Sequence, residues 1–219
     1  MILVPATVHG RVLIEPGEGA AVSSRALVGF HGYAQTAADM MQDLNRIPGA
    51  SGWTRVSIQA LNRFYVRGDA QVVANWMTRE DRDQAIADNI AYVDSAIGHL
   101  STRAAEHQST RALVFVGFSQ GVAMAYRAAL SGTRPAAGII ALAGDIPPEL
   151  KTEAPARNPW PKVLIGVGHL EQWYSSDKVD ADRAFLESRG IDHSIVRFKG
   201  GHEWGEEFRN AAGAFLAAL

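Results

Sequence analysis

The sequence predicts an α/β protein with a mostly parallel central sheet that helices cover on both faces. Two observations carry this prediction. Short runs rich in β-branched and other apolar residues alternate with longer amphipathic runs of helical period along most of the chain. The runs 113–117 and 138–143 are continuously apolar, which is typical of strands buried on both faces of a parallel sheet. We therefore expect a single domain over residues 1–219.

The same alternation sets the expected order of elements. The opening segment 6–20 predicts edge strands around a Pro/Gly turn. The expected strands of the main sheet are 25–31, 54–60, 111–117, 136–144, 161–168 and 192–198. The expected helices are 36–47, 79–100, 120–130, 176–190 and 204–219.

Capping residues support two of these helices. Thr36 is the expected N-cap of helix 36–47, and Asp39 stands close to the position that a capping box requires. Gly190 is expected to end helix 176–190, because glycine adopts the left-handed conformation that commonly follows a helix.

Two segments are predicted to be irregular. Segment 61–80 follows the second strand of the sheet, and segment 145–161 follows the strand 136–144. The second is predicted to be a loop because it holds Pro147, Pro148, Pro155, Pro159 and Pro161. Neither segment is long enough for a large cap domain.

Composition excludes several classes of function. The net charge is −2 with no long run of one sign, so no nucleic-acid partner is expected. The apolar stretches have the length of strands, so no stable membrane insertion is expected. The chain has no cysteine, which excludes disulfides, thiolate metal sites and thiol catalysis. With no convincing signal peptide at the start, a cytoplasmic location is expected. A homodimer is compatible with the sequence, but nothing in it specifies one.

The segment GFSQG, residues 117–121, holds the candidate nucleophile. A G-x-S-x-G between a strand and a helix is the nucleophile elbow of the α/β-hydrolase fold. Glycines at 117 and 121 leave room for the strand and the helix to pack around Ser119, and the helix N-terminus faces a developing oxyanion. The alternative is a small serine at an ordinary glycine-rich bend, which the position of the motif between strand and helix argues against.

A serine nucleophile needs a base and an acid, which in this fold follow it in the order acid, then histidine. His202 lies in a glycine-rich loop directly after the last strand and is the candidate base; the alternative is a loop or helix-cap histidine. Glu171 follows the strand 161–168 and is the preferred acid. Asp145, after the strand 136–144, remains the rival.

The oxyanion hole is expected from two backbone N–H groups, those of Gln120 after the nucleophile and of Tyr33 in the loop after strand 25–31. His31 is expected to brace that loop without transferring protons. Aromatic and methionine side chains in the loops are candidates for substrate binding, with packing in the core as the alternative for each. These candidates are Phe64, Tyr65, Trp76, Met77, Trp173 and Tyr174.

Four segments resemble the phospholipase/carboxylesterase family of small α/β-hydrolases, which includes bacterial carboxylesterases and acyl-protein thioesterases. These are FHGYAQTAADM, GFSQGVAMA, VGHLEQWY and GGHEW, in the order and spacing of that family. The resemblance runs from about residue 25 to the end of the chain. It places the nucleophile, acid and base on Ser119, Glu171 and His202, and the oxyanion donors on Tyr33 and Gln120.

Three positions depart from the family pattern. Ala34 and Val122 stand where the family usually has glycine, and Glu171 stands where it usually has aspartate. The expected function is a serine carboxylesterase that hydrolyses small or medium-chain esters, with a small-molecule ester as partner and no metal or organic cofactor. The alternatives are a thioesterase or lysophospholipase on the same site, or a binding protein that keeps the fold without catalysis.

Overall fold

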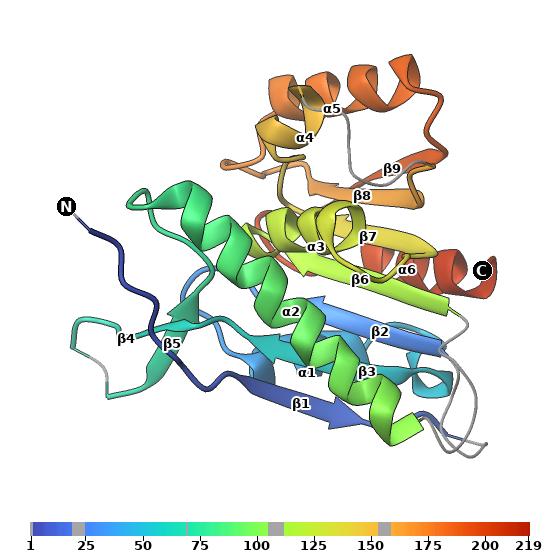
Figure 1. The fold of residues 1–219 in the computed structure, drawn as a ribbon. Coiled ribbons are helices and arrows are strands. Elements are labelled where there is room, and N and C mark those ends of the chain that lie inside the picture. The colour runs from blue at the N-terminus through green and yellow to red at the C-terminus, as the bar shows by residue number, and fades with distance from the viewer. Residues whose placement is uncertain (1, 19–24, 69, 105–111, 153–158) are drawn as a thin grey trace.

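The computed structural model describes residues 2–18, 25–68, 70–104, 112–152 and 159–219 (Figure 1). A seven-stranded sheet runs through the protein in the order β1-β3-β2-β6-β7-β8-β9. Its strands are β1 (Arg11–Glu15), β2 (Arg25–Phe30), β3 (Thr54–Gln59), β6 (Ala112–Phe118), β7 (Gly138–Leu142), β8 (Lys162–Gly168) and β9 (His193–Phe198). Only β1 pairs antiparallel to its neighbour. The predicted mostly parallel sheet is confirmed.

Helices cover both faces of the sheet, as predicted, because alternate residues of each strand face opposite ways. In β6, Phe115 packs in the cluster that includes α2 (Arg82–Ala104), α3 (Gln120–Ser131) and α5 (Ser176–Ser188). The next residue, Val116, packs in the cluster on the other face with α1 (Ala37–Asn45) and α6 (Glu206–Ala217). Each large apolar side chain buried in this way contributes about 1.5–3 kcal/mol.

The two predicted capping residues have the expected geometry, although α1 and α5 each end two residues before the predicted bound. The side chain of Thr36 accepts a hydrogen bond from the Asp39 N–H, and the Asp39 carboxylate accepts from the Thr36 N–H, so that the capping box before α1 is complete. Gly190 has φ 63°, the left-handed conformation expected just after α5.

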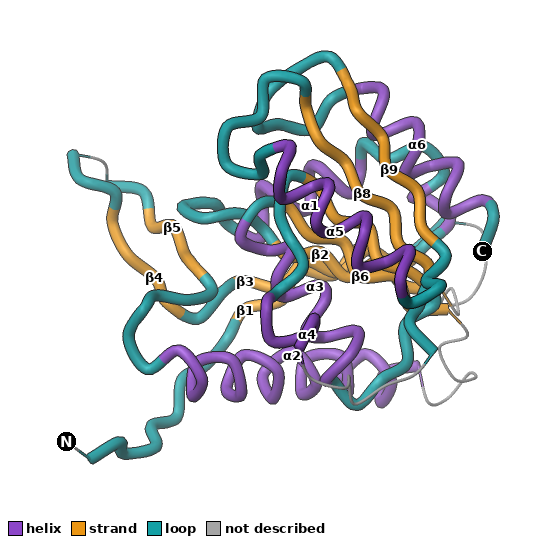
Figure 2. Tube along the Cα trace, turned by 90° about the horizontal axis from the view of Figure 1, so that it is seen from above, coloured by secondary structure: helices purple, strands orange, loops and turns teal. Residues whose placement is uncertain are grey.

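Segment 61–80 was predicted to be irregular, and this prediction is wrong. It contains β4 (Asn62–Tyr65) and β5 (Val72–Asn75), which pair antiparallel as a separate hairpin. Figure 2 shows this hairpin extending away from the main sheet. Its strands are short and mix polar with apolar residues, so the pattern that marks a buried strand is missing.

Two smaller predictions also need correction. The loop predicted over 145–161 contains a short helix, α4 (Pro148–Thr152). Proline favours the first position of a helix, where its missing N–H has no partner to lose, so a proline pair does not exclude a helix. In the opening segment the structure has one strand, β1, and residues 19–20 of that segment lie outside the described residues.

Parallel pairing places the functional loops at one edge of the sheet. Strands β2, β6, β7, β8 and β9 are parallel neighbours in that order, so their carboxyl ends meet there. Ser119 follows β6, Glu171 follows β8 and His202 follows β9. Residues far apart in the chain are therefore brought to the same edge.

Candidate active site

Ser119 stands at the join of β6 and α3 in a backbone conformation that L-residues rarely adopt, with φ 53° and ψ −121°. Its N–H donates a hydrogen bond of 2.9 Å to the carbonyl of Leu142, which ties the turn to β7. A Cβ at Gly117 would lie 2.5 Å from a Cα of α3, and one at Gly121 would lie 2.0 Å from the carbonyl oxygen of Phe30. The strained turn therefore depends on both glycines.

The imidazole of His202 lies between Ser119 and Glu171. Its Nε2 is 2.8 Å from Ser119 Oγ, and its Nδ1 is 2.7 Å from Glu171 Oε2. Because an ionised carboxylate can only accept, Nδ1 carries the proton that it donates to Glu171. That tautomer leaves Nε2 free to accept the Ser119 hydroxyl proton. The three side chains thus have the contacts of a nucleophile, a base and an orienting acid.

Glu171 has a buried side chain, only 1% exposed. Its Oε1 accepts hydrogen bonds from the N–H groups of Trp173 at 2.7 Å and Tyr174 at 3.3 Å. Burial raises the pKa of the Glu171 carboxyl, but these N–H groups and His202 outweigh burial, so that its pKa lies below the ordinary value. Glu171 is therefore ionised at neutral pH.

The loop with Glu171 and the loop with His202 are joined by backbone contacts. The N–H of His169 donates to the carbonyl of Phe198 at 2.9 Å, and the N–H of Leu170 donates to the carbonyl of Gly200 at 2.8 Å. A Cβ at Gly168 would lie 2.4 Å from the carbonyl oxygen of Gly201. This close approach holds the acid loop against the histidine loop, and Glu171 reaches His202 from it with a side chain one methylene longer than the aspartate usual in the family.

Asp145, the rival acid, has a different partner. Its carboxylate lies 3.5 Å from the ammonium group of Lys178 on α5, and its side chain is 48% exposed. Of the two carboxylates that follow adjacent strands, the structure brings Glu171 to His202.

Tyr33 and Gln120 lie on the two segments that flank Ser119. A Cβ at Gly32 would lie 3.3 Å from the Cβ of Ser119, so the loop after β2 passes directly beside the serine. Among the turn, loop and side-chain hydrogen bonds of the described residues, none uses the backbone N–H of Tyr33 or Gln120 as donor. Neither N–H group is therefore taken up by one of these hydrogen bonds.

His31 is fully buried and braces the loop after β2, as predicted. Its Nδ1 donates to the carbonyl of Gly32 at 2.7 Å, and its Nε2 accepts from the N–H of Ala60 at 3.1 Å. Burial lowers the pKa of the His31 ring. A neutral ring with both nitrogens engaged holds the backbone and has no site left for proton transfer.

The fold accommodates both Ala34 and Val122, which stand where the family usually has glycine. Ala34 has φ 58°, in the left-handed region where glycine is favoured, and its N–H donates to the carbonyl of Ala74 at 3.0 Å. Val122, in the first turn of α3, is fully buried in the core. The first position carries a modest backbone cost and the second gains apolar burial.

The candidate substrate-binding residues divide into two groups. Trp76 and Tyr174 are each 1% exposed; the Trp76 Nε1–H donates to the carbonyl of His31, and the Tyr174 hydroxyl donates to buried Asp182. These two side chains lie in the core and present no surface to a ligand. The others are open or partly open.

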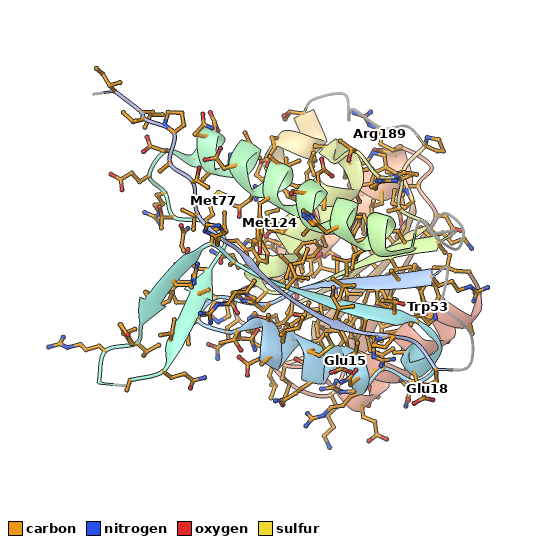
Figure 3. All side chains as sticks on the ribbon, turned by 60° about the horizontal axis from the view of Figure 1, so that its bottom comes forward. Glu15, Glu18, Trp53, Met77, Met124 and Arg189 are labelled. Atoms are coloured by element: carbon orange, nitrogen blue, oxygen red, sulfur yellow. The ribbon has the colours of Figure 1, made fainter. Side chains whose placement is uncertain are left out.

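The other four candidates have exposed or half-buried side chains on the hairpin, at its base or on the Glu171 loop. Trp173 is 72% exposed beside the Glu171 loop, and Tyr65 is 69% exposed on β4. The ring of Phe64 packs against Tyr33 with centroids 5.5 Å apart. Met77, half-buried, lies at the base of the hairpin (Figure 3).

Two residues that contact the site were missed by sequence analysis. The ring of Phe118 packs against the ring of His202 with centroids 5.0 Å apart, and the side chain of Gln35 accepts from the N–H of Gly32 at 2.7 Å. Phe118 stands inside the GFSQG motif, so its proximity to the site could have been inferred. No pattern in the sequence marks the Gln35 side chain.

Within the described ranges, no group of three or more His, Asp or Glu side chains is arranged to hold a metal ion. In the same part of the chain, no helix combines the length and apolar character needed to cross a membrane.

Solved structures of esterases have the same fold. Esterase PE8 aligns with a TM-score of 0.74 at 23% identity, covering 97% of this chain and 100% of its own. The Bacillus cereus carboxylesterase aligns with a TM-score of 0.68 at 15% identity, covering 96% and 95%. The Dyadobacter fermentans phospholipase/carboxylesterase aligns with a TM-score of 0.69 at 19% identity, covering 97% and 99%. No curated protein sequence matches the chain.

The family assignment rests on the sequence itself. The phospholipase/carboxylesterase family model matches residues 71–218, which include the elbow and the loops that carry Glu171 and His202. The predicted family is therefore confirmed; three of the four segments, GFSQGVAMA, VGHLEQWY and GGHEW, lie within the matched residues, and the α/β-hydrolase fold agrees with the assignment. This chain belongs to the phospholipase/carboxylesterase family of α/β-hydrolases.

Proposed function

We propose that the protein is a serine carboxylesterase that hydrolyses small or medium-chain carboxylic esters through an acyl-serine intermediate. The observation that carries this proposal is the continuous set of hydrogen bonds from Glu171 through His202 to Ser119, at 2.7 Å and 2.8 Å. Membership of the phospholipase/carboxylesterase family supports the same class of reaction.

In the acylation step, His202 Nε2 takes the proton of the Ser119 hydroxyl as its oxygen attacks the ester carbonyl. The buried, ionised Glu171 stabilises the imidazolium that forms and keeps the ring oriented. Collapse of the tetrahedral intermediate breaks the bond to the alcohol oxygen, and His202 returns its proton to that leaving group.

In the deacylation step, His202 takes a proton from water, and the resulting hydroxide attacks the acyl carbon. The Ser119 oxygen leaves and receives the proton back from His202, which releases the carboxylic acid. Both steps pass through an oxyanion. The backbone N–H groups of Tyr33 and Gln120 would stabilise it, and one such donor is typically worth about 10²- to 10³-fold in rate.

The proposed substrate class is supported by the side chains on the loops around the serine. The ring of Phe64 packs against that of Tyr33, which follows Gly32 in the loop beside Ser119. Trp173, which is exposed, lies on the same loop as Glu171. These rings supply apolar contact area for an acyl or alcohol group without enclosing it. An open site of this kind favours small or medium-chain esters over long lipids.

A chain-length series of nitrophenyl esters tests the proposal. Wild type is expected to hydrolyse them with highest kcat/KM at short or medium acyl length, and Ser119→Ala is expected to have no turnover above background. Thioester and lysophospholipid substrates at matched acyl length separate the related acyl hydrolases. A folded wild type with no turnover of any acyl substrate would contradict the proposal and favour a binding protein.

A further inference from the structure

The end of β5 and the residues that follow it lie between the two segments proposed to hold the oxyanion. We call residues 74–77 the connecting segment. Figure 3 places Met77, the last of them, where the hairpin meets the body of the protein. The contacts of this segment involve both the loop after β2 and the first turn of α3.

The connecting segment is bound first to the loop after β2. The N–H of Ala74 donates to the carbonyl of Gln35 at 3.0 Å, and the N–H of Ala34 donates to the carbonyl of Ala74 at 3.0 Å. The Nε1–H of Trp76 donates to the carbonyl of His31 at 2.9 Å. Three hydrogen bonds thus fix the loop that contains Tyr33 against this segment.

The other side of the connecting segment is bound by the side chain of Gln120. Its Oε1 accepts from the N–H of Trp76 at 2.9 Å, and its Nε2 donates to the carbonyl of Met77 at 3.0 Å. Both ends of the amide are used, so the side chain pairs with the backbone as a peptide group would. The side chain of Asn89 on α2 donates to the carbonyl of Trp76 at 2.8 Å, which also fixes the connecting segment to α2.

The two proposed donors each lie beyond the end of a strand, so their separation depends on contacts other than strand pairing. The pairing of β2 with β6 ends at Phe30 opposite Gly117. Tyr33 and Gln120 are each three residues further along the chain, where no strand pairing fixes the distance between them. An oxyanion hole accelerates a reaction only when its donors are held in place before the charge develops.

We propose that the side chain of Gln120 is a positioning residue that sets the geometry of the oxyanion hole through the connecting segment. It holds the first turn of α3 and the loop with Tyr33 at a fixed separation, while its own backbone N–H contacts the oxyanion. This inference rests on the proposed esterase function. It gives the β4–β5 hairpin a part in catalysis that does not involve contact with substrate.

The test uses Gln120→Met, which keeps the length of the side chain and removes both hydrogen bonds. Gln84→Met is the matched control, because Gln84 is exposed on α2 and its amide binds Asp88. Turnover of a short nitrophenyl ester is measured per active site, titrated with a fluorophosphonate. We expect kcat to fall about tenfold to hundredfold in Gln120→Met with little change in KM. The control is expected to stay within about twofold of wild type.

An alkylboronic acid gives a second readout, because its adduct with Ser119 places an oxyanion in the hole. Its affinity is expected to fall with kcat in Gln120→Met. If the side chain served only to keep the protein folded, the titrated number of active sites would fall while kcat per site and boronic acid affinity stayed unchanged. That outcome would overturn the proposal.

Gln120→Glu keeps the proposal testable if the methionine variant does not fold. A neutral carboxylic acid can accept from the Trp76 N–H and donate to the Met77 carbonyl, whereas a carboxylate has no donor. We expect the kcat of this variant, relative to wild type at the same pH, to rise as pH falls. A ratio that does not change with pH would overturn the proposal.

The wild type separates this proposal from the esterase proposal. Absence of ester turnover and of fluorophosphonate labelling in wild type would contradict both. An active wild type whose kcat is unaffected by Gln120→Met would contradict only the positioning role.

Discussion

His202 Nδ1 lies 2.7 Å from Glu171 Oε2, while the other candidate acid, Asp145, is paired with Lys178. This contact distinguishes two carboxylates that the sequence left as rivals. It depends on the acid loop approaching the histidine loop closely, which Gly168 permits because a Cβ there would strike Gly201. The carboxylate contact that orients the histidine thus depends on backbone packing between two loops.

Neutralising each acid in turn tests this relationship. Glu171→Gln removes the charge that stabilises the imidazolium and offers His202 an amide in its place, so kcat is expected to fall by about 10²- to 10⁴-fold. Asp145→Asn makes the same chemical change on a side chain paired with Lys178, and is expected to stay within about twofold of wild type. Steady-state kinetics with one nitrophenyl ester compares the two. A larger loss of kcat in Asp145→Asn than in Glu171→Gln would mean that Asp145 is the acid that orients His202.

The lowered pKa of Glu171 predicts a dependence of stability on pH. A carboxyl whose folded pKa lies below its unfolded value stabilises the fold above the unfolded pKa, and this contribution is lost as pH falls through the folded pKa. The difference in free energy of unfolding between wild type and Glu171→Gln should therefore shrink as pH falls below the ordinary value of 4.5. Urea denaturation across that range measures it. A difference that is constant with pH would show that Glu171 has no lowered pKa.

Adjacent aromatic residues are expected to behave differently on substitution. Trp173→Ala removes an exposed ring on the Glu171 loop and is expected to raise KM for the longer esters by about three- to tenfold, with stability unchanged. Tyr174→Phe removes the hydroxyl that donates to buried Asp182, and is expected to lower the free energy of unfolding by about 1–3 kcal/mol with KM unchanged. Kinetics and urea denaturation of both variants separate binding from packing. A raised KM in Tyr174→Phe would place that side chain in the binding site.

A glycine-to-alanine substitution at the elbow is expected to have the opposite effect on stability from one on α2. In Gly121→Ala the new Cβ would lie 2.0 Å from the carbonyl oxygen of Phe30, so the free energy of unfolding should fall by about 3 kcal/mol or more. Gly98, on α2, has open space around its Cβ position, and Gly98→Ala should raise stability by about 0.5–1 kcal/mol. Urea denaturation measures both. Equal stability of wild type and Gly121→Ala would mean that strand and helix can separate at this turn.

Much of the fold could be predicted because its main elements have strong local patterns. The apolar runs that became β6 and β7 are buried on both faces, and Thr36 with Asp39 marks the start of α1 without reference to the rest of the chain. The β4–β5 hairpin was missed because its short strands are specified by pairing with each other and by contacts with the body of the protein. Such contacts leave no periodic pattern.

For the candidate site too, sequence analysis found the residues that local motifs mark and missed contacts between distant residues. Ser119 and His202 stand directly after strands in glycine-rich turns, where position alone indicates them. The sequence around Trp76 does not distinguish a tryptophan that faces solvent from one that lies in the core. Only the structure reveals its hydrogen bond to the carbonyl of His31. The pairing of the Gln120 side chain with residues 76 and 77 joins positions more than 40 residues apart, which no local motif encodes.

The central claim is that Ser119 is the nucleophile. Wild type and Ser119→Ala are treated with a fluorophosphonate, and the intact mass and the labelled peptide are determined by mass spectrometry. The account predicts one adduct on wild type, located on Ser119 in the peptide containing GFSQG, and none on Ser119→Ala. An adduct on another residue, or no adduct on folded wild type, would contradict it.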